Sequence, residues 1–342
     1  MNLIQHLLFL LAFLFSTKGA QGALEEKHVP FDDPDHGFVD RMYLQYLPSN
    51  YEEQESFPLV IDFHGFSMTA DGQRLYSKWD VLAEEEGFIA IFPEGVPDSP
   101  SELRGWNIND DVGPYGDVCD RDRNYWGEYE CHYSCEECDP KTSCKEGMTC
   151  YNDVAFVEAL VDILLTELKA DPARVHITGL SNGAQFSYFL ASFSSFKFAS
   201  FGIVSGVPFL GFGPLPKYKT PIIDFHGVLD DVIPYSTDSE EGSWGEGPDG
   251  VVSTVISYDG MYYYEKPNYF QYLADGFDCS SGERWETAMD GVDGWKCIKH
   301  QCEADVALVA CTGDYGHQYP FDEDVLQGTR IMWGFMKNYA AK

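Results

Sequence analysis

A serine held between two glycines constrains this chain more than any other feature. It lies in residues 179–183, Gly-Leu-Ser-Asn-Gly, where a short apolar strand over 174–178 gives way to a helix expected to begin near Ala184. A turn this sharp needs glycines two positions before and after the serine, because a Cβ there would clash with the passing backbone. The turn lifts the Ser181 hydroxyl above the end of the strand, where it can act as a nucleophile.

Short apolar strands alternate with amphipathic helices along most of the chain. Strands are expected over residues 38–47, 58–63, 88–92, 175–178, 201–204, 222–225 and 306–311. Helices are expected over residues 75–86, 153–168, 184–192, 268–275 and 322–339. This alternation predicts an α/β fold, in which a mostly parallel central sheet is flanked by helices on both faces. Functional residues of such sheets gather beyond the C-terminal ends of the strands.

Two further side chains follow Ser181 in an order that suits a catalytic triad. Asp230 comes after the strand at 222–225, and His317 lies on a glycine-containing loop after the last strand. His317 would accept the proton of Ser181, and Asp230 would orient the imidazole and stabilise its charged form. Asp231 is a rival for the role of Asp230. The order Ser, Asp, His is that of the α/β-hydrolases, whose nucleophile elbow the serine turn matches.

Two backbone N–H groups are expected to bind the oxyanion that forms when the serine attacks a carbonyl. One belongs to Asn182, and the other to Gly65 or Phe66, on the loop after the strand at 58–63. The side chain of Asn182 is expected to play no part. His64 is expected to shape the oxyanion loop, and His226 to pack or hydrogen-bond beneath the loop that carries the acid.

The N-terminus and the charge indicate where the protein acts. The apolar run over 7–15, followed by small residues, predicts a secretory signal peptide over residues 1–22; a membrane anchor is the alternative, but the run is short for a span. Residues 23–342 are expected to form one catalytic domain. With 56 acidic and 22 basic residues, the chain carries a net charge of −34. Such a surface repels nucleic acid and anionic membranes, so neither is expected as a partner once the signal is cleaved.

The ten cysteines of an exported chain predict disulfides. Six of them fall between Cys119 and Cys150, within a polar segment at 107–150 that is expected to be a disulfide-rich insertion. Zinc or iron–sulfur binding by this cluster is the alternative. The six cysteines allow fifteen pairings, and spacing does not choose among them.

The motifs resemble those of secreted polyhydroxybutyrate depolymerases and of the feruloyl and acetylxylan esterases of the same type, over about residues 57–338. The resemblance is carried by residues 57–65, 152–156, 171–183, 225–235 and 316–320. It implies an α/β-hydrolase fold, with Asp230 as the catalytic acid and His317 as the base. It also implies that Cys279 pairs with Cys302, which would leave Cys297 for Cys311. The insertion and the long loop at 238–259 depart from the family, so the resemblance leaves the substrate preference open.

The expected protein is therefore a secreted serine esterase that forms an acyl-enzyme. Its substrate would be a polyhydroxyalkanoate or a feruloyl or acetyl ester of a cell-wall polysaccharide. The aromatic residues Trp106, Trp244 and Tyr262 are candidate platforms for such a substrate.

Two other functions compete with the esterase. A peptidase of the prolyl-oligopeptidase type would share the fold, but the chain lacks a propeller-like repeat region. A non-catalytic binding module on the same scaffold is disfavoured by the complete Ser–Asp–His set. No cofactor or metal is implied: a metal site built from His64, His226 and His317 lacks a supporting pair of ligands at helical spacing.

Overall fold

A ten-stranded sheet forms the centre of the protein, in the order β1-β2-β4-β3-β7-β8-β9-β15-β14-β13. The computed structural model describes residues 22–98, 102–108, 112–113, 116–117, 119, 131–135, 148–210, 215–236, 243–246, 253–256, 260–286, 294–320 and 325–341. From β4 to β15 every neighbouring pair is parallel. The outer strands on both sides are antiparallel to their neighbours. The predicted fold class is confirmed.

The elements have the following bounds. The strands of the large sheet are β1 (Ala23–Asp33), β2 (Gly37–Leu47), β3 (Phe57–Phe63), β4 (Ile89–Pro93), β7 (Ala170–Leu180), β8 (Ser200–Val204), β9 (Ile222–Gly227), β13 (Glu283–Arg284), β14 (Lys296–Gln301) and β15 (Ala307–Gly313). The helices are α2 (Ala70–Ser77), α3 (Trp79–Glu86), α4 (Asp153–Glu167), α5 (Asn182–Phe193), α6 (Lys266–Gly276) and α7 (Val325–Met336). Two small sheets consist of β5 (Val112–Gly113) with β6 (Gly116–Asp117), and of β10 (Ser243–Glu246), β11 (Ser253–Ile256) and β12 (Tyr262–Tyr264).

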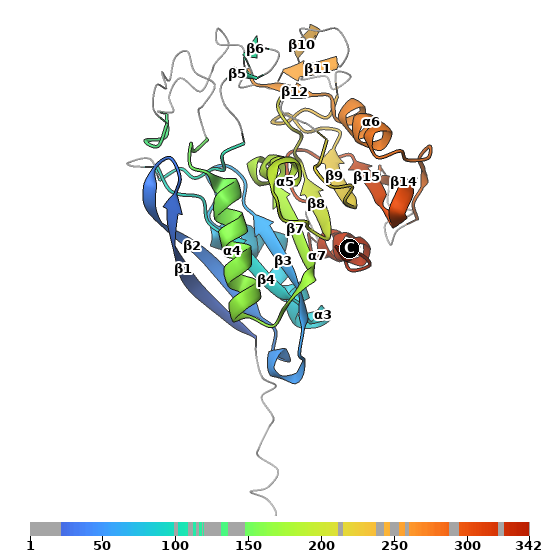
Figure 1. The fold of residues 1–342 in the computed structure, drawn as a ribbon. Helices are drawn as coiled ribbons and strands as arrows, with labels where there is room; N and C mark the ends of the chain where they lie inside the picture. Colours follow the sequence, from blue (N-terminus) through green and yellow to red (C-terminus); the bar gives the residue numbers. More distant parts are fainter. Residues whose placement is uncertain are drawn as a thin grey trace, which may run out of the picture.

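The large sheet separates two hydrophobic cores. Successive side chains of a strand point to opposite faces, so Leu59 and Ile61 of β3 enter one core while Val60 enters the other. Helices α4, α5 and α6 cover the first core, and α2, α3 and α7 cover the second. Figure 1 shows α4 in front of the sheet and α3 and α7 behind it.

Several elements differ from the sequence prediction. Strand β1 was not predicted, and it pairs with the outer side of β2, the strand expected at 38–47. The single helix expected at 75–86 is two helices, since Lys78 takes a left-handed conformation (φ 61°) between α2 and α3. Strands β13 and β14 were not predicted from the sequence. Their short, polar or mixed stretches carry no continuous apolar signal.

The domain prediction is only partly covered by the described residues. Residues 1–21 of the predicted signal peptide lie outside them, as does most of the insertion at 107–150. The extent of the signal peptide and of the catalytic domain therefore remain predictions. No helix among the described residues combines the length and apolar character that a membrane span requires.

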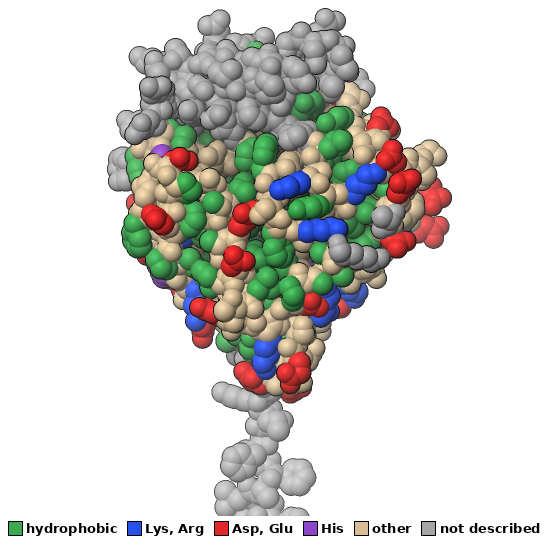
Figure 2. Space-filling view, viewed as in Figure 1, with side chains coloured by type: hydrophobic (Ala, Val, Ile, Leu, Met, Phe, Trp, Pro, Cys, Tyr) green, Lys and Arg blue, Asp and Glu red, His purple; other side chains and the backbone are tan. Residues whose placement is uncertain are grey.

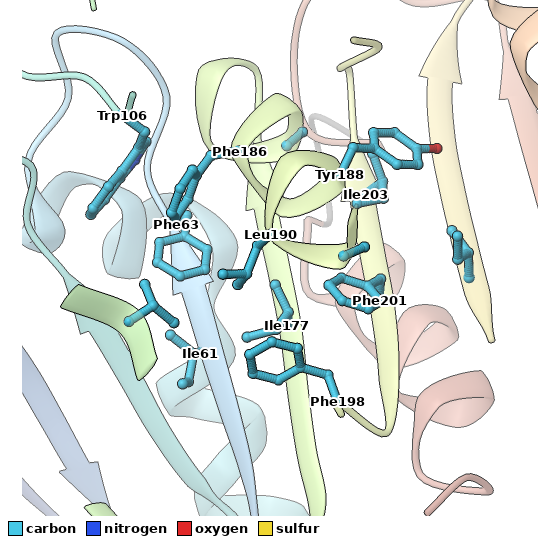
Figure 3. Close-up of a cluster of buried hydrophobic side chains, with 14 of the residues drawn as sticks. Ile61, Phe63, Trp106, Ile177, Phe186, Tyr188, Leu190, Phe198, Phe201 and Ile203 are labelled. Carbon is cyan, nitrogen blue, oxygen red and sulfur yellow. The ribbon is translucent and has the colours of Figure 1, made fainter. Parts of the chain in front are cut away.

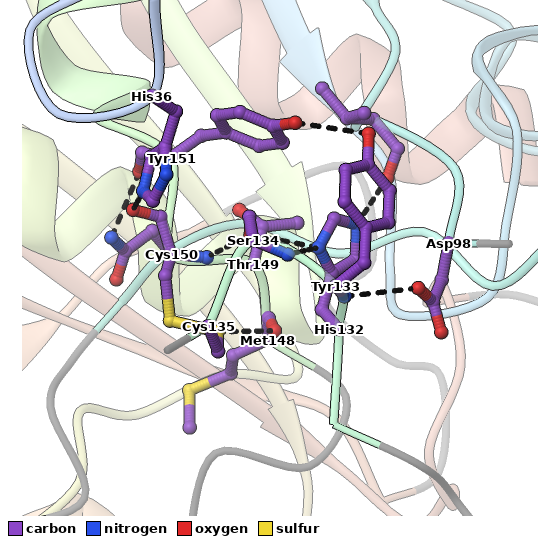
Figure 4. The surroundings of a disulfide bond; sticks show 12 residues. His36, Asp98, His132, Tyr133, Ser134, Cys135, Met148, Thr149, Cys150 and Tyr151 are labelled. Atoms are coloured by element: carbon purple, nitrogen blue, oxygen red, sulfur yellow. Dashed lines mark hydrogen bonds between the residues drawn. A yellow bond between two sulfur atoms is a disulfide. The ribbon is translucent and has the colours of Figure 1, made fainter. Parts of the chain in front are cut away.

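Three disulfides join two cysteines that are both among the described residues. The pairs Cys279–Cys302 and Cys297–Cys311 confirm the pairing implied by the resemblance. In the insertion, Cys135 pairs with Cys150, and Figure 4 shows this bond beside His132 and Tyr151. Cys119 and Cys131 are also disulfide-bonded. These four insertion cysteines therefore do not offer free thiolates to zinc or to an iron–sulfur cluster.

Candidate active site

The serine turn has the strained geometry that its sequence predicts. Ser181 precedes α5 with φ 56° and ψ −120°, a conformation that non-glycine residues rarely adopt. A Cβ on Gly179 would lie 2.5 Å from the carbonyl oxygen of Gly183, and one on Gly183 would lie 2.3 Å from that of Phe63. Both glycines are therefore required for β7, α5 and β3 to approach each other this closely.

Ser181, His317 and Asp230 form a continuous hydrogen-bonded chain. The Nε2 atom of His317 lies 2.8 Å from Ser181 Oγ. Its Nδ1 atom lies 2.9 Å and 3.0 Å from the two carboxylate oxygens of Asp230. The Asp230 side chain is fully buried, whereas that of His317 is 17% exposed. The acid is thus shielded from water, while the imidazole is partly open to solvent.

The surroundings of Asp230 favour its charged form. The backbone N–H groups of Val232 and Ile233 donate to Oδ1 over 3.0 Å and 2.8 Å. Burial opposes ionisation, but hydrogen bonds from His226 and His317 outweigh it and hold the pKa of Asp230 well below its usual range. The acid is therefore ionised at neutral pH. Its rival Asp231 is exposed at the surface.

Two further histidines lie near the triad and bind backbone groups. His226 Nε2 lies 2.8 Å from the Ile233 carbonyl oxygen and 3.2 Å from Asp230 Oδ2, beneath the acid loop. His64 Nε2 accepts the N–H of Gly95 over 2.9 Å, so its Nδ1 carries the proton and donates to the Gly65 carbonyl over 2.8 Å. Burial lowers the pKa of His64 to about 4, which keeps the ring neutral. Among the described residues, no three potential ligands come together as a metal site.

The residues predicted to bind the oxyanion lie beside the serine. A Cβ placed on Gly65 would be 3.3 Å from the Cβ of Ser181, so the loop after β3 packs directly against the elbow. Asn182 is the first residue of α5, and the N–H groups of a first helical turn have no partner within the helix. Phe66 follows Gly65 in the same loop and is half-buried. Their role as oxyanion donors remains a prediction.

One expectation about the side chains near the elbow is wrong, and another side chain makes a contact that the sequence did not predict. Trp106 is not a substrate platform, because it is fully buried and stacks on Phe186 with ring centroids 5.3 Å apart (Figure 3). The Asn182 side chain is not idle, because its Oδ1 accepts the backbone N–H of Trp106 over 2.7 Å. No sequence signal could have revealed a contact between residues so far apart in the chain.

Trp244 and Tyr262 are the other two residues predicted to be substrate platforms. Trp244 belongs to β10, but its side chain lies outside the part of the structure that is described. Tyr262 is half-buried on β12, and its carbonyl accepts the N–H of Leu210 over 2.9 Å. This bond ties β12 to the segment that follows β8. A role for either residue in substrate binding remains a prediction.

A buried charged cluster lies beneath the elbow and had no counterpart in the sequence prediction. The ammonium of Lys266 pairs with Asp224 and donates to the Gly206 carbonyl over 2.5 Å. The hydroxyl of Tyr188 donates to the same carboxylate over 2.5 Å. Burial lowers the pKa of Lys266, although Asp224 opposes the shift. A Cβ on Gly206 would lie 3.0 Å from the Ser181 carbonyl oxygen, so the cluster supports the strand end that abuts the elbow.

The chain is similar to known esterases. No protein-family model matches the chain. Over 190 residues, which are 56% of the chain, it is 25% identical to the bifunctional acetylxylan esterase/xylanase XynS20E of Neocallimastix patriciarum. The matched part is only 21% of that relative, so the chain spans a small fraction of its length.

Solved structures share the fold over nearly the whole chain. An acetyl xylan esterase from Aspergillus awamori superposes with a TM-score of 0.53 at 15% identity, covering 92% of this chain and 99% of that one. The native structure of a protein called pOPH gives a TM-score of 0.52 at 15% identity, covering 94% and 90%. The chain has an α/β-hydrolase fold, and the predicted resemblance to esterases with this fold is confirmed.

Proposed function

We propose that this protein is a secreted serine esterase that cleaves carboxylic esters through an acyl-enzyme. The observation that carries the proposal is the position of His317, which bridges the hydroxyl of Ser181 and the carboxylate of Asp230. A base in contact with a nucleophile and oriented by a third group is the arrangement that nucleophilic catalysis requires.

The reaction proceeds in two halves. Ser181 Oγ attacks the ester carbonyl carbon and gives its proton to His317 Nε2, while Asp230 stabilises the imidazolium. The tetrahedral oxyanion is bound by the N–H of Asn182 and by an N–H of the Gly65–Phe66 loop. The carbon–oxygen bond to the alcohol then breaks, and the alcohol leaves with the proton of His317. Water, deprotonated by His317, attacks the acyl-enzyme and releases the acid and Ser181.

The substrate that we propose is an acetyl or feruloyl ester carried on a xylan-type polysaccharide. The name of the relative supports the acetyl ester, since it is an acetylxylan esterase joined to a xylanase. A polyester remains the alternative suggested by sequence resemblance. Neither substrate needs a metal or a cofactor, because the triad and the oxyanion donors supply the whole reaction.

Export is part of the same proposal. Three disulfides among the described residues suit an oxidising compartment. Expression of the full chain in a secreting host should yield a protein whose N-terminal sequence begins at Ala23. Retention of residues 1–22 on a membrane-bound product would instead support the anchor.

A fluorophosphonate probe tests the catalytic part directly. The wild-type protein should be labelled covalently, and Ser181→Ala should not be. Ser192→Ala is the matched control, because its hydroxyl lies on the same helix and binds the carbonyl of Tyr188 over 3.1 Å. It should be labelled like the wild type. An unlabelled wild-type protein would favour a binding module over an enzyme.

A substrate panel then separates the ester classes. Acetylated xylan, feruloylated arabinoxylan oligosaccharides, polyhydroxybutyrate and a dipeptidyl amide should be compared on one preparation. We expect release of acetate or ferulate from the polysaccharide substrates. Cleavage of the amide alone would support the peptidase, and equal indifference to every ester would contradict the proposal.

A further inference from the structure

Trp106 hydrogen-bonds to both segments that carry the proposed oxyanion donors, although it is not itself one of the donors. Its backbone N–H donates to Asn182 Oδ1 over 2.7 Å, and its indole N–H donates to the carbonyl of His64 over 2.9 Å. Asn182 carries one proposed oxyanion donor. His64 immediately precedes Gly65, which begins the loop that carries the other. One side chain and its own backbone therefore link the start of α5 to the end of β3.

The ring of Trp106 is fixed on the same two elements. It stacks on Phe186 of α5 at an interplanar angle of 14° and meets the edge of Phe63 of β3 with centroids 5.0 Å apart. Figure 3 shows the three rings packed together at the upper end of the core. Because Trp106 is fully buried, its ring cannot tilt without displacing one of these elements.

The backbone next to Trp106 is anchored independently. The N–H of Asn107 donates to Asp153 Oδ2 over 2.8 Å, and the Thr149 hydroxyl donates to the same oxygen over 3.1 Å. The other oxygen of Asp153 pairs with Arg41 over 2.8 Å, and both side chains are 1% exposed. Residues at the two ends of the insertion thus bind one buried carboxylate, that of Asp153. These bonds fix the backbone next to Trp106.

We infer that Trp106 is a positioning residue that sets the distance between the two oxyanion donors. The inference rests on the proposed esterase function. Oxyanion donors accelerate a reaction because they are already in place when the charge develops, so a brace that fixes both donors acts on the transition state. Trp106 does not touch the reacting atoms. Its effect is transmitted through Asn182 and the His64–Gly65 peptide.

The substitution Trp106→Phe tests the inference with the least disturbance. It keeps an aromatic ring between Phe63 and Phe186, and it removes the indole N–H that holds the His64 carbonyl. We expect kcat for p-nitrophenyl acetate to fall about tenfold with KM nearly unchanged, a fraction of the 10²–10³ typical when a whole oxyanion donor is lost. The affinity for a trifluoromethyl ketone, which forms a tetrahedral adduct with the serine, should fall by a similar factor.

Trp333→Phe is the matched control for a general effect on stability. Trp333 is also buried, at 4% exposure, and its indole N–H donates to Glu86 over 3.3 Å in the core on the other side of the sheet. We expect this variant to lower the melting temperature while kcat and the affinity for the ketone stay at wild-type levels.

The outcomes separate the inference from the function on which it rests. The inference is overturned if Trp106→Phe keeps the wild-type kcat and ketone affinity, or if Trp333→Phe loses both to the same extent. A folded wild-type protein that hydrolyses no ester and takes no fluorophosphonate would instead refute the proposed function.

Discussion

Asp230 performs two tasks that depend on its burial. It accepts two backbone N–H groups of its own loop, and it holds the imidazole of His317 toward Ser181. The first task fixes the acid in place, and the second fixes the tautomer of the base. Both backbone N–H groups bind Oδ1, and an amide keeps one oxygen that can accept them, so it would keep the shape of the loop. An amide lacks the second oxygen that binds the imidazole, so it would disturb the proposed proton relay.

An amide at position 230 would separate these two tasks. Asp230→Asn should lower kcat for p-nitrophenyl acetate by about 10⁴-fold at neutral pH, because the base would be held in the wrong tautomer. Asp231→Asn is the control. Asp231 is exposed, so its variant should retain wild-type turnover. Equal losses in the two variants would contradict the assignment of the acid.

Asp62 is a buried acid on β3. Burial raises its pKa from the ordinary 3.8 to about 7, although the Gln73 amide donates to both its oxygens over 3.0 Å. Between these pH values the folded state binds a proton that the unfolded state has released, so stability falls as pH rises through this window. Relative to that of Asp62→Asn, the free energy of unfolding of the wild type should fall by up to about 1.4 kcal/mol per pH unit from pH 4 to 7.

Urea unfolding at several pH values measures this difference. The absolute stability of Asp62→Asn is unimportant, since only the change of the difference with pH reports the titration of Asp62. A difference that is constant from pH 4 to 7, or one that changes in the opposite direction, would contradict the raised pKa.

The triad could be predicted from sequence because each member lies at the end of an apolar strand. The residues are 87 and 136 positions apart, yet parallel strands bring their C-terminal ends to one edge of the sheet. The brace at Trp106 could not be predicted in this way. Its partners lie 42 and 76 residues away in the chain. From sequence alone, an aromatic residue in a loop can equally be a substrate platform or a core residue.

Helices and strands were predicted correctly where their side chains form a continuous apolar signal. Helix α4 and the strands β3, β4, β8 and β9 are buried on long stretches and were found near their observed bounds. Strand β1 was missed because its first half is exposed and carries charge, so its pairing with β2 leaves little trace in composition. The break between α2 and α3 was missed because Lys78, not glycine, adopts the left-handed conformation.

The break at Lys78 holds a non-glycine residue in the left-handed conformation. A residue with a Cβ pays roughly 1–2 kcal/mol for the left-handed conformation, and glycine does not, although glycine loses more entropy on folding. Lys78→Gly should therefore raise the free energy of unfolding by about 0.5–1 kcal/mol in urea titrations. Val81→Gly, at an exposed helical position in α3, should instead lower it by about 1 kcal/mol. A destabilised Lys78→Gly would show that the lysine side chain contributes contacts that outweigh the strain.

Negative charge is the dominant property of the protein's composition. The chain has 34 more acidic than basic residues, and Figure 2 shows acidic side chains spread over the visible face and gathered at one flank. A substrate with negative charge must approach against this field. Screening by salt weakens the field, because the Debye length falls from about 30 Å at 0.01 M to about 8 Å at 0.15 M.

The salt dependence of the proposed esterase reaction should report this field. From about 10 to 150 mM NaCl, kcat/KM for p-nitrophenyl hemisuccinate, an anionic ester, should rise several-fold as repulsion is screened. The value for the neutral p-nitrophenyl acetate should change little. A fall for the anionic ester would mean that the approach to Ser181 is locally positive despite the net charge.

The outermost strand of the large sheet has a consequence for the protein at high concentration. Among the residues that the structure describes, no strand pairs with the outer margin of β1. This strand carries exposed Glu25 and Glu26 together with Pro30, which lacks an N–H to offer an incoming strand. The opposite margin, β13, is only two residues long. Both ends of the sheet thus discourage edge-to-edge polymerisation, so replacing the two glutamates and Pro30 with valine would leave the core intact while inviting fibrous aggregates.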